Sequence, residues 1–144
     1  MTTLRPSDGE AEYPRLLEIW RSAVEATHHF LAPADVEYYA TRVPRYFPEV
    51  DLTVAEVGGI AAGFSGTAEG KLEMLFVHDK FRGRGVGTAL LRAAVERFPD
   101  LTLDVNEQNP QAVGFYLHHG FEVAGRRETD SDGRPFPLLE LKRA

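Results

Sequence analysis

The stretch LFVHDKFRGRGVG at residues 75–87 decides the fold of this chain, because it joins two kinds of secondary structure through a glycine-rich turn. Its first three residues are apolar and end a strand, and a charged turn follows them. Alternating glycines then lead into VGTALLRAAVERF, where apolar residues recur at helical spacing. We therefore expect a strand, a turn and a major helix that runs from about Arg84 to Phe98.

The start of that helix is suited to binding an anion. The first four N–H groups of a helix have no partner within it, and the helix dipole places positive charge at the same end. Glycine lets a ligand approach the backbone closely, so a phosphate or a pyrophosphate suits this turn. Taken alone, the same glycines are also compatible with a tight turn whose arginines lie in solvent.

A second segment, NPQAVGFYLHHGF at 109–121, follows after one helix and one strand. Asn109 is expected to cap the helix that it precedes, and Pro110 to occupy its first turn, where a missing N–H is harmless. Together, RGRGVG at 82–87 and the pattern N-x-x-A-x-x-F-Y-x-x-x-G-F at 109–121 resemble the GCN5-related N-acetyltransferase (GNAT) superfamily. The runs NEQN at 106–109 and GRPFPLL at 133–139 resemble one branch of small bacterial acetyltransferases within it.

The rest of the chain fits the fold that this resemblance implies. Asp8 is expected to cap the first helix, which carries Leu16 and Trp20, and a second helix should start near Pro33 and end before Pro44. A Gly-Gly pair at 58–59 predicts a hairpin turn. The expected strands lie at 2–6, 51–57, 60–67, 71–77, 101–106, 121–128 and 136–142.

These elements predict one α/β (α+β) domain that spans residues 1–144. The resemblance implies the GNAT fold, in which a mixed, mostly antiparallel sheet is flanked by helices and its central strand pair splays apart. That gap between the two strands is where the family binds its cofactor.

Composition excludes several classes of protein. With 144 residues, 43% of them apolar, the chain is typical of a soluble globular domain. A net charge of −6 argues against a nucleic-acid partner and fits a cationic substrate. The absence of cysteine excludes a thiolate metal site, and the five histidines form no credible metal site either. No signal peptide or membrane span is apparent, so no membrane partner and a cytoplasmic location are expected.

The resemblance implies acetyl-coenzyme A as cofactor, in the sense of a cosubstrate, and no metal. The helix start would hold the pyrophosphate, and the strand before it would bind the pantetheine arm through main-chain atoms. An amide N–H at 75–77 would stabilise the oxyanion of the reaction. The implied cofactor-binding residues are Leu75, Phe76, Val77, Arg82, Gly83, Arg84, Gly85, Val86, Gly87, Thr88, Asn109, Ala112 and Phe115.

Tyr116 occupies the position at which the family places its catalytic acid. A phenol with a pKa near 10 can donate a hydrogen bond, and then its proton, to a departing thiolate. For the general base, Glu73 is the first candidate, because alternation along its strand places it on the face of Leu75 and Val77. An acidic side chain on an apolar strand needs a partner or a cavity.

Other groups are candidates for the base or for the acceptor site. His28, His29 and Phe30 follow the first helix, where the family binds its acceptor, and a histidine titrates near neutral pH. Glu107 follows the next strand, and a chain of water molecules could also carry the proton. The aromatic and basic region at 24–46 suits a protein lysine, a protein N-terminus or a small amine, and homodimers are common in the family.

Two rival functions fit the sequence less well than an acetyltransferase. A dinucleotide-binding oxidoreductase would need a third glycine where Thr88 stands, and a shorter turn after the strand. A non-catalytic module that binds acyl-coenzyme A, or that regulates a partner, would not need Tyr116. An acetyltransferase that acts on a primary amine is therefore the function that the sequence favours.

Overall fold

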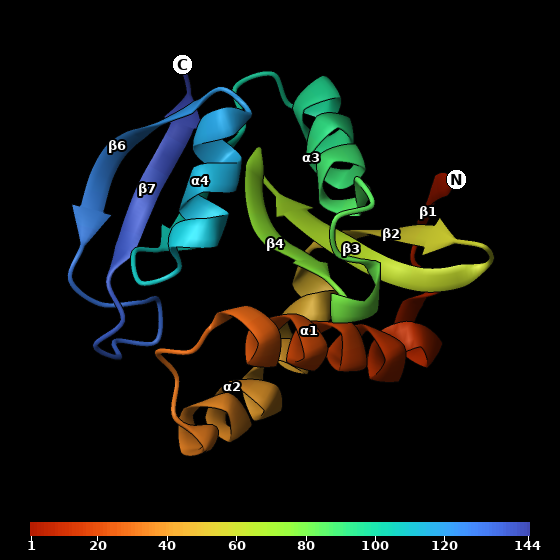
Figure 1. Cartoon of the computed structure of the whole chain (residues 1–144), viewed down its shortest axis with the longest axis horizontal. Coiled ribbons are helices and arrows are strands. Elements are labelled where there is room, and N and C mark those ends of the chain that lie inside the picture. The colour runs from red at the N-terminus through yellow and green to blue at the C-terminus, as the bar shows by residue number, and fades with distance from the viewer.

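The computed structural model describes all residues, 1–144, and its centre is a seven-stranded mixed sheet in the order β1-β2-β3-β4-β5-β7-β6 (Figure 1). Every neighbouring pair is antiparallel except β4 and β5, which are parallel. This arrangement confirms the predicted α/β class and its mostly antiparallel sheet. The strands are β1 (Thr2–Pro6), β2 (Asp51–Val57), β3 (Ile60–Ala68), β4 (Lys71–Val77), β5 (Thr102–Asn106), β6 (Phe121–Arg127) and β7 (Leu138–Arg143).

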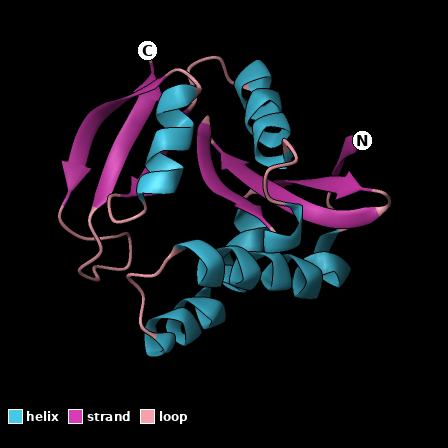
Figure 2. Ribbon diagram, viewed as in Figure 1, coloured by secondary structure: helices cyan, strands magenta, loops and turns pink.

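Four α-helices cover the two faces of this sheet (Figure 2). The helix α1 crosses one face over β3 and β4, and α2 packs on α1. On the opposite face α3 covers β1 to β4, and α4 lies against β5 and β6. No helix combines the length and the apolar character that crossing a membrane would require. The helices are α1 (Tyr13–Thr27), α2 (Pro33–Tyr46), α3 (Val86–Arg97) and α4 (Pro110–His118).

The first helix does not begin as predicted. Asp8 precedes a short 3-10 helix, Gly9–Glu12, and its side chain makes no capping bond. Instead, the Glu12 carboxylate accepts hydrogen bonds from the backbone N–H of Asp8 (2.9 Å), from Ser7 and from Arg5. The chain entering α1 is therefore fixed by Glu12, and the prediction that Asp8 caps the first helix is wrong.

The second helix continues through Pro44 to Tyr46, so the prediction that it ends before Pro44 is also wrong. Proline removes one N–H and crowds the preceding turn. Here it stands in the last turn, and the chain passes directly into the 3-10 helix Phe47–Glu49, so little helix follows the missing bond. The other boundaries differ from the expected ones by a few residues at most.

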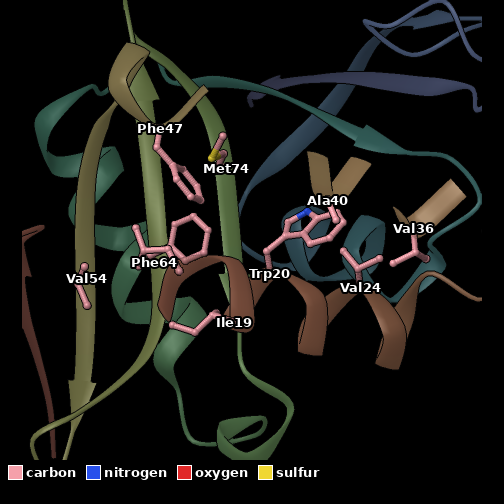
Figure 3. Packing of buried hydrophobic residues seen from close by; sticks show 10 residues of the cluster. Ile19, Trp20, Val24, Val36, Ala40, Phe47, Val54, Phe64 and Met74 are labelled. Carbon is pink, nitrogen blue, oxygen red and sulfur yellow. The ribbon is translucent and has the colours of Figure 1, made fainter. Parts of the chain in front are cut away.

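The face under α1 and α2 holds the largest single cluster of the core, and two smaller clusters lie on the opposite face. Ten buried side chains form one cluster there, and Figure 3 shows Phe47 and Phe64 turned toward each other while Trp20 and Val24 rise from α1 toward α2. The ring of Phe64 is fully buried and lies 5.8 Å from the rings of both Phe47 and Phe76. Aromatic contacts of this kind contribute beyond the area that they bury.

The parallel strands β4 and β5 separate soon after they begin. They pair only at Lys71 with Thr102 and at Leu72 with Leu103. On the other side of β4, Thr67 pairs with Leu72 but Gly66 pairs with Met74, so Glu73 is an extra residue in a β-bulge. A bulge bends its strand and increases its twist. The predicted splay is confirmed, and beyond Leu72 the edge of β4 that faces β5 has no strand partner.

The bulge also changes which side chains share a face. Leu72 and Leu75 pack in the same cluster although their spacing is odd. Strict alternation from Glu73 to Leu75 and Val77 is therefore interrupted at the bulge, and Glu73 is exposed. Its candidacy as a base depends on the cavity that it faces and not on alternation.

Replacing Phe64 by alanine is expected to lower the free energy of unfolding by about 3–5 kcal/mol, because the change empties a fully buried site between two aromatic rings. Denaturant unfolding measures this difference. Ile60→Ala is the matched control on the same strand, since that side chain is 53% exposed and its loss should cost within about 0.5 kcal/mol. A similar cost for both variants would contradict the packing described for Phe64.

Candidate functional site

Two cavities meet where β4 and β5 separate. The first, which we call the strand cleft, has a volume of about 320 Å³ and lies between β4, β5 and α4. The second, which we call the helix cavity, has about 490 Å³ and lies between α1, α2, β4 and the loop 128–137. Both volumes are in the range of small-molecule sites. The residues that line both cavities are His28, Leu72, Glu73, Met74, Phe76, Asp104, Asn106 and Leu138.

Most of the predicted cofactor-binding residues lie along the strand cleft. Those that line it are Leu75, Phe76, Val77, Arg82, Gly87, Asn109, Ala112 and Phe115, together with Tyr116. The remaining five belong to the adjoining turn and the first turn of α3; they are Gly83, Arg84, Gly85, Val86 and Thr88. The structure thus brings both sequence motifs to one cleft, from segments that are about thirty residues apart.

The turn before α3 exposes backbone N–H groups beside the cleft. Gly85 precedes the helix with a φ of +79°, a left-handed conformation that glycine adopts without strain. The first bond of the helix runs from Ala89 N–H to the Gly85 carbonyl (3.0 Å), which leaves the N–H groups of residues 86–88 without helical partners. The Val86 side chain is buried in the core, so only its backbone can serve a ligand.

Arg82 connects this turn to α4 at the edge of the cleft. Its guanidinium donates to Asp79 Oδ1 (2.9 Å) and to Gln111 Oε1 (3.1 Å). Gln111 lines the cleft and was not predicted, because its position in the first turn of α4 carries no distinctive sequence signal. The guanidinium of Arg84 lies 5.5 Å from the centre of the Phe81 ring instead.

On α4, Asn109 and Tyr116 are both buried and both line the strand cleft. The Oδ1 atom of Asn109 accepts the N–H of Ala112 (3.3 Å), which confirms the predicted cap. Tyr116 packs against Phe115 and Phe121 at ring distances of 5.2 and 6.0 Å. Burial alone raises the pKa of the Tyr116 phenol above its usual value, so the hydroxyl keeps its proton at neutral pH and can donate it.

His28 closes α1 at the junction of the two cavities. Its Nδ1 lies 2.8 Å from the hydroxyl of Thr27, and its ring centre lies 5.3 Å from that of Phe30. Burial, and to a lesser degree the neighbouring charge of His29, lowers the pKa of the His28 imidazole to about 4. His28 is therefore neutral at physiological pH.

The remaining candidates for the base and the acceptor site divide into two groups. Glu73 lines both cavities, and Phe30 lines the helix cavity, where its ring lies 5.8 Å from Phe136. His29 is exposed and lines neither cavity. Glu107 is also outside both, because its carboxylate accepts two hydrogen bonds from Arg126 on β6, at 2.6 and 3.1 Å. The structure does not support placing His29 and Glu107 in the acceptor site.

The loop 128–137 forms the second wall of the helix cavity and was not predicted from the sequence. Asp130, Asp132 and Phe136 of this loop line the cavity. Its contacts with α2 include a hydrogen bond from the Tyr39 hydroxyl to Asp130 and an ion pair of Arg42 Nε with Asp132 at 3.3 Å. These partners are about ninety residues apart in the chain, so no local pattern could have paired them.

Comparison with known proteins identifies relatives along nearly the whole chain. The family model described as an acetyltransferase (GNAT) domain matches residues 18–141. A curated relative from Salmonella typhimurium, the peptidyl-lysine N-acetyltransferase YjaB, is 42% identical over 142 residues, which cover 98% of this chain and 97% of that protein.

Solved structures of acetyltransferases also match along the whole chain. The solution structure of apo-form YjaB from Escherichia coli matches with a TM-score of 0.92 at 39% identity, over 100% of this chain and 98% of that one. The PaiA N-acetyltransferase of Thermoplasma acidophilum, solved in complex with coenzyme A, matches with a TM-score of 0.77 at 18% identity, over 100% and 99% of the two chains. At that low identity the second likeness is one of fold alone.

The depressed pKa of His28 makes the stability of the protein depend on pH. In the unfolded chain a histidine binds a proton below about pH 6.5, whereas His28 in the folded protein binds one only below about pH 4. The unfolded state holds more protons between these values, so the free energy of unfolding falls as the pH falls through this window. At about 1.4 kcal/mol per pKa unit, His28 accounts for a loss of up to about 3 kcal/mol.

Denaturant unfolding at pH 7 and pH 4.5 measures this effect. His28→Gln is expected to be less sensitive to acid than the wild type, and His118→Gln, which changes an exposed histidine, should behave as the wild type does. Equal acid sensitivity in the wild type and His28→Gln would show that His28 is not buried as described.

Proposed function

Because this chain belongs to the GNAT acetyltransferase family, we propose that it moves the acetyl group of acetyl-coenzyme A to a primary amine, by direct attack within a ternary complex. The observation that carries the proposal is the junction of the two cavities. The open edge of β4 leads from the glycine turn of α3 to the point where the helix cavity joins the strand cleft. One cavity can hold the donor while the other presents the acceptor.

The strand cleft has the features that the donor requires. Unpaired N–H groups at the start of α3 suit the pyrophosphate, and the left-handed Gly85 directs the backbone toward it. The partnerless edge of β4 can hydrogen-bond the amide groups of the pantetheine arm, as a strand does when it pairs with a peptide. At Gly87 an added Cβ would lie 3.6 Å from the Phe115 ring, so a larger side chain would fill this end of the cleft.

The reacting groups then have defined roles. Tyr116 donates its proton to the departing sulfur, since burial keeps the phenol protonated. A backbone N–H of residues 75–77 stabilises the negative charge that develops on the carbonyl oxygen. Glu73, exposed at the bulge and lining both cavities, is the carboxylate that receives the ammonium form of the acceptor and removes its first proton.

Protein lysine is the acceptor that we propose, with a protein N-terminus or a small amine as the alternatives. The relatives named as peptidyl-lysine N-acetyltransferases support this choice. The helix cavity supports it as well, because Glu49 and Glu73 line it without an ion-pair partner, while its lysine, Lys71, is paired with Asp104 at 2.8 Å. Homodimer formation and a cytoplasmic location stay predictions from the sequence.

Calorimetric titration tests whether the strand cleft binds the proposed donor, acetyl-coenzyme A. Acetyl-coenzyme A and coenzyme A are expected to bind, and NADH is not. Gly87→Leu should weaken the binding of acetyl-coenzyme A and coenzyme A by about 10-fold or more, because the larger side chain fills one end of the strand cleft. Gly114→Leu is the matched control, because it changes an exposed helical glycine with no atom within 4 Å of an added Cβ. Undiminished affinity of a folded Gly87→Leu would place the phosphate site elsewhere.

The variant Tyr116→Phe tests whether the Tyr116 hydroxyl is the proton donor of the reaction. This variant is expected to lower kcat by about 100-fold or more while the affinity for acetyl-coenzyme A changes little, because only the proton donor is lost. A thiol-release assay with a lysine peptide gives kcat, and calorimetry gives the affinity. Wild-type turnover in Tyr116→Phe would remove Tyr116 from the mechanism, and binding without transfer in the wild type would favour a non-catalytic module.

A further inference from the structure

We infer that His28 is the base that takes the proton from the attacking amine, and that Thr27 fixes the tautomer in which it can do so. This inference rests on the proposed function and assigns one step of it. His28 would be a catalytic residue, because its ring would contact the reacting nitrogen. Thr27 would be a positioning residue that acts through His28.

The position of His28 in the fold supports its assignment as the base. Only three titratable side chains line both cavities, and they are His28, Glu73 and Asp104. Asp104 is engaged by Lys71 at 2.8 Å and by Arg127, so its oxygens serve to join β4, β5 and β6. Of the remaining two, Glu73 is exposed, whereas the imidazole of His28 is half-buried at the junction itself. A group that accepts a proton during acyl transfer must be within reach of the nitrogen that attacks.

The hydrogen bonds of Thr27 determine which nitrogen of His28 carries the proton. The Thr27 hydroxyl lies 2.7 Å from the carbonyl oxygen of Ala23, which can only accept, so the single hydroxyl proton is donated there. The 2.8 Å contact between the same hydroxyl and His28 Nδ1 must then run the other way, with Nδ1–H as the donor. The lone pair of the neutral ring is therefore on Nε2, and no side chain or backbone group of the protein donates to that atom.

Two further features hold the ring ready for this role. Phe30 packs against it at 5.3 Å and is itself held by Phe136, so the imidazole has little freedom to turn. Burial keeps the ring neutral, which means that its lone pair is available without prior loss of a proton. A neutral acceptor in a partly closed site also gives the uncharged form of the amine a hydrogen bond that orients its own lone pair.

The amine nitrogen forms a bond with the thioester carbonyl carbon, and the bond between that carbon and sulfur breaks. One proton leaves the amine nitrogen for His28 Nε2, while the Tyr116 hydroxyl gives its proton to the sulfur, which departs as a thiol. The proton on His28 is then returned to the Tyr116 oxygen through water, and the products are an amide and free coenzyme A.

The tautomer can be tested without any activity. In the free protein, long-range proton–nitrogen NMR spectra of the histidine rings are expected to show His28 with Nδ1 protonated. Thr27→Val removes the acceptor for that proton and should shift the ring toward the other tautomer or a mixture, whereas Thr27→Ser keeps the hydroxyl and should preserve the wild-type pattern. A wild-type His28 with Nε2 protonated would overturn the inference.

Steady-state kinetics test the role of His28 as the base. His28→Gln is expected to lower kcat with a lysine peptide by about 100-fold and to leave the affinity for acetyl-coenzyme A unchanged by calorimetry. Thr27→Val should lower kcat by a smaller factor, and Thr27→Ser should restore it. The control His118→Gln, an exposed histidine outside both cavities, should have the wild-type kcat.

The outcomes separate this inference from the function on which it rests. A wild type that transfers acetyl groups together with a His28→Gln variant of wild-type kcat would overturn the role of His28 and leave the proposed function intact. A wild type that binds acetyl-coenzyme A but acetylates no amine would overturn the proposed function, and the role of His28 with it. The NMR result would still stand as a property of the folded chain.

Discussion

The site depends on one constraint, which is that two parallel strands pair for two residues and then separate. Lys71 and Asp104 bridge β4 and β5 at the end where they still pair. The extra residue Glu73 then bends β4 away while its other edge stays bonded to β3. A strand edge without a partner is ordinarily a liability, because its polar groups lack hydrogen bonds. Here the same edge faces a cleft in which a ligand can supply them.

Burial gives the two groups beside this edge their chemistry. Tyr116 and His28 titrate in different ranges in water, yet burial acts on both in the direction of the neutral form. The phenol therefore stays a donor, and the imidazole stays an acceptor, over the whole physiological range of pH. A proton donor and a proton acceptor can therefore stand in one site without exchanging a proton beforehand, because neither one is charged.

The sequence predicted the framework well and the acceptor side poorly. Periodicity and turn residues located every strand and helix, and the two motifs placed Tyr116, Asn109 and Gly87 on one cleft. These signals are local, so they are visible in a single sequence. A single sequence does not show which side chains pair between distant segments. No residue near Glu107 in the sequence indicates that Arg126 donates a hydrogen bond to its carboxylate. Likewise, no residue near Tyr39 indicates that its hydroxyl bonds to Asp130.

The two cavities share the residues at their junction but differ in their outer walls, and this difference has an evolutionary consequence. The outer wall of the strand cleft consists of α4, beside the separated strands β4 and β5, whereas that of the helix cavity consists of α2 and the loop 128–137. The loop is attached to α2 through polar contacts such as that of Arg42 with Asp132. Substitutions in α2 or in the loop can reshape the helix cavity, which we propose receives the acceptor, without disturbing the strand cleft, which we propose binds the donor. Under the proposed function, a lineage with this architecture can therefore acquire new acceptors while it keeps the same donor.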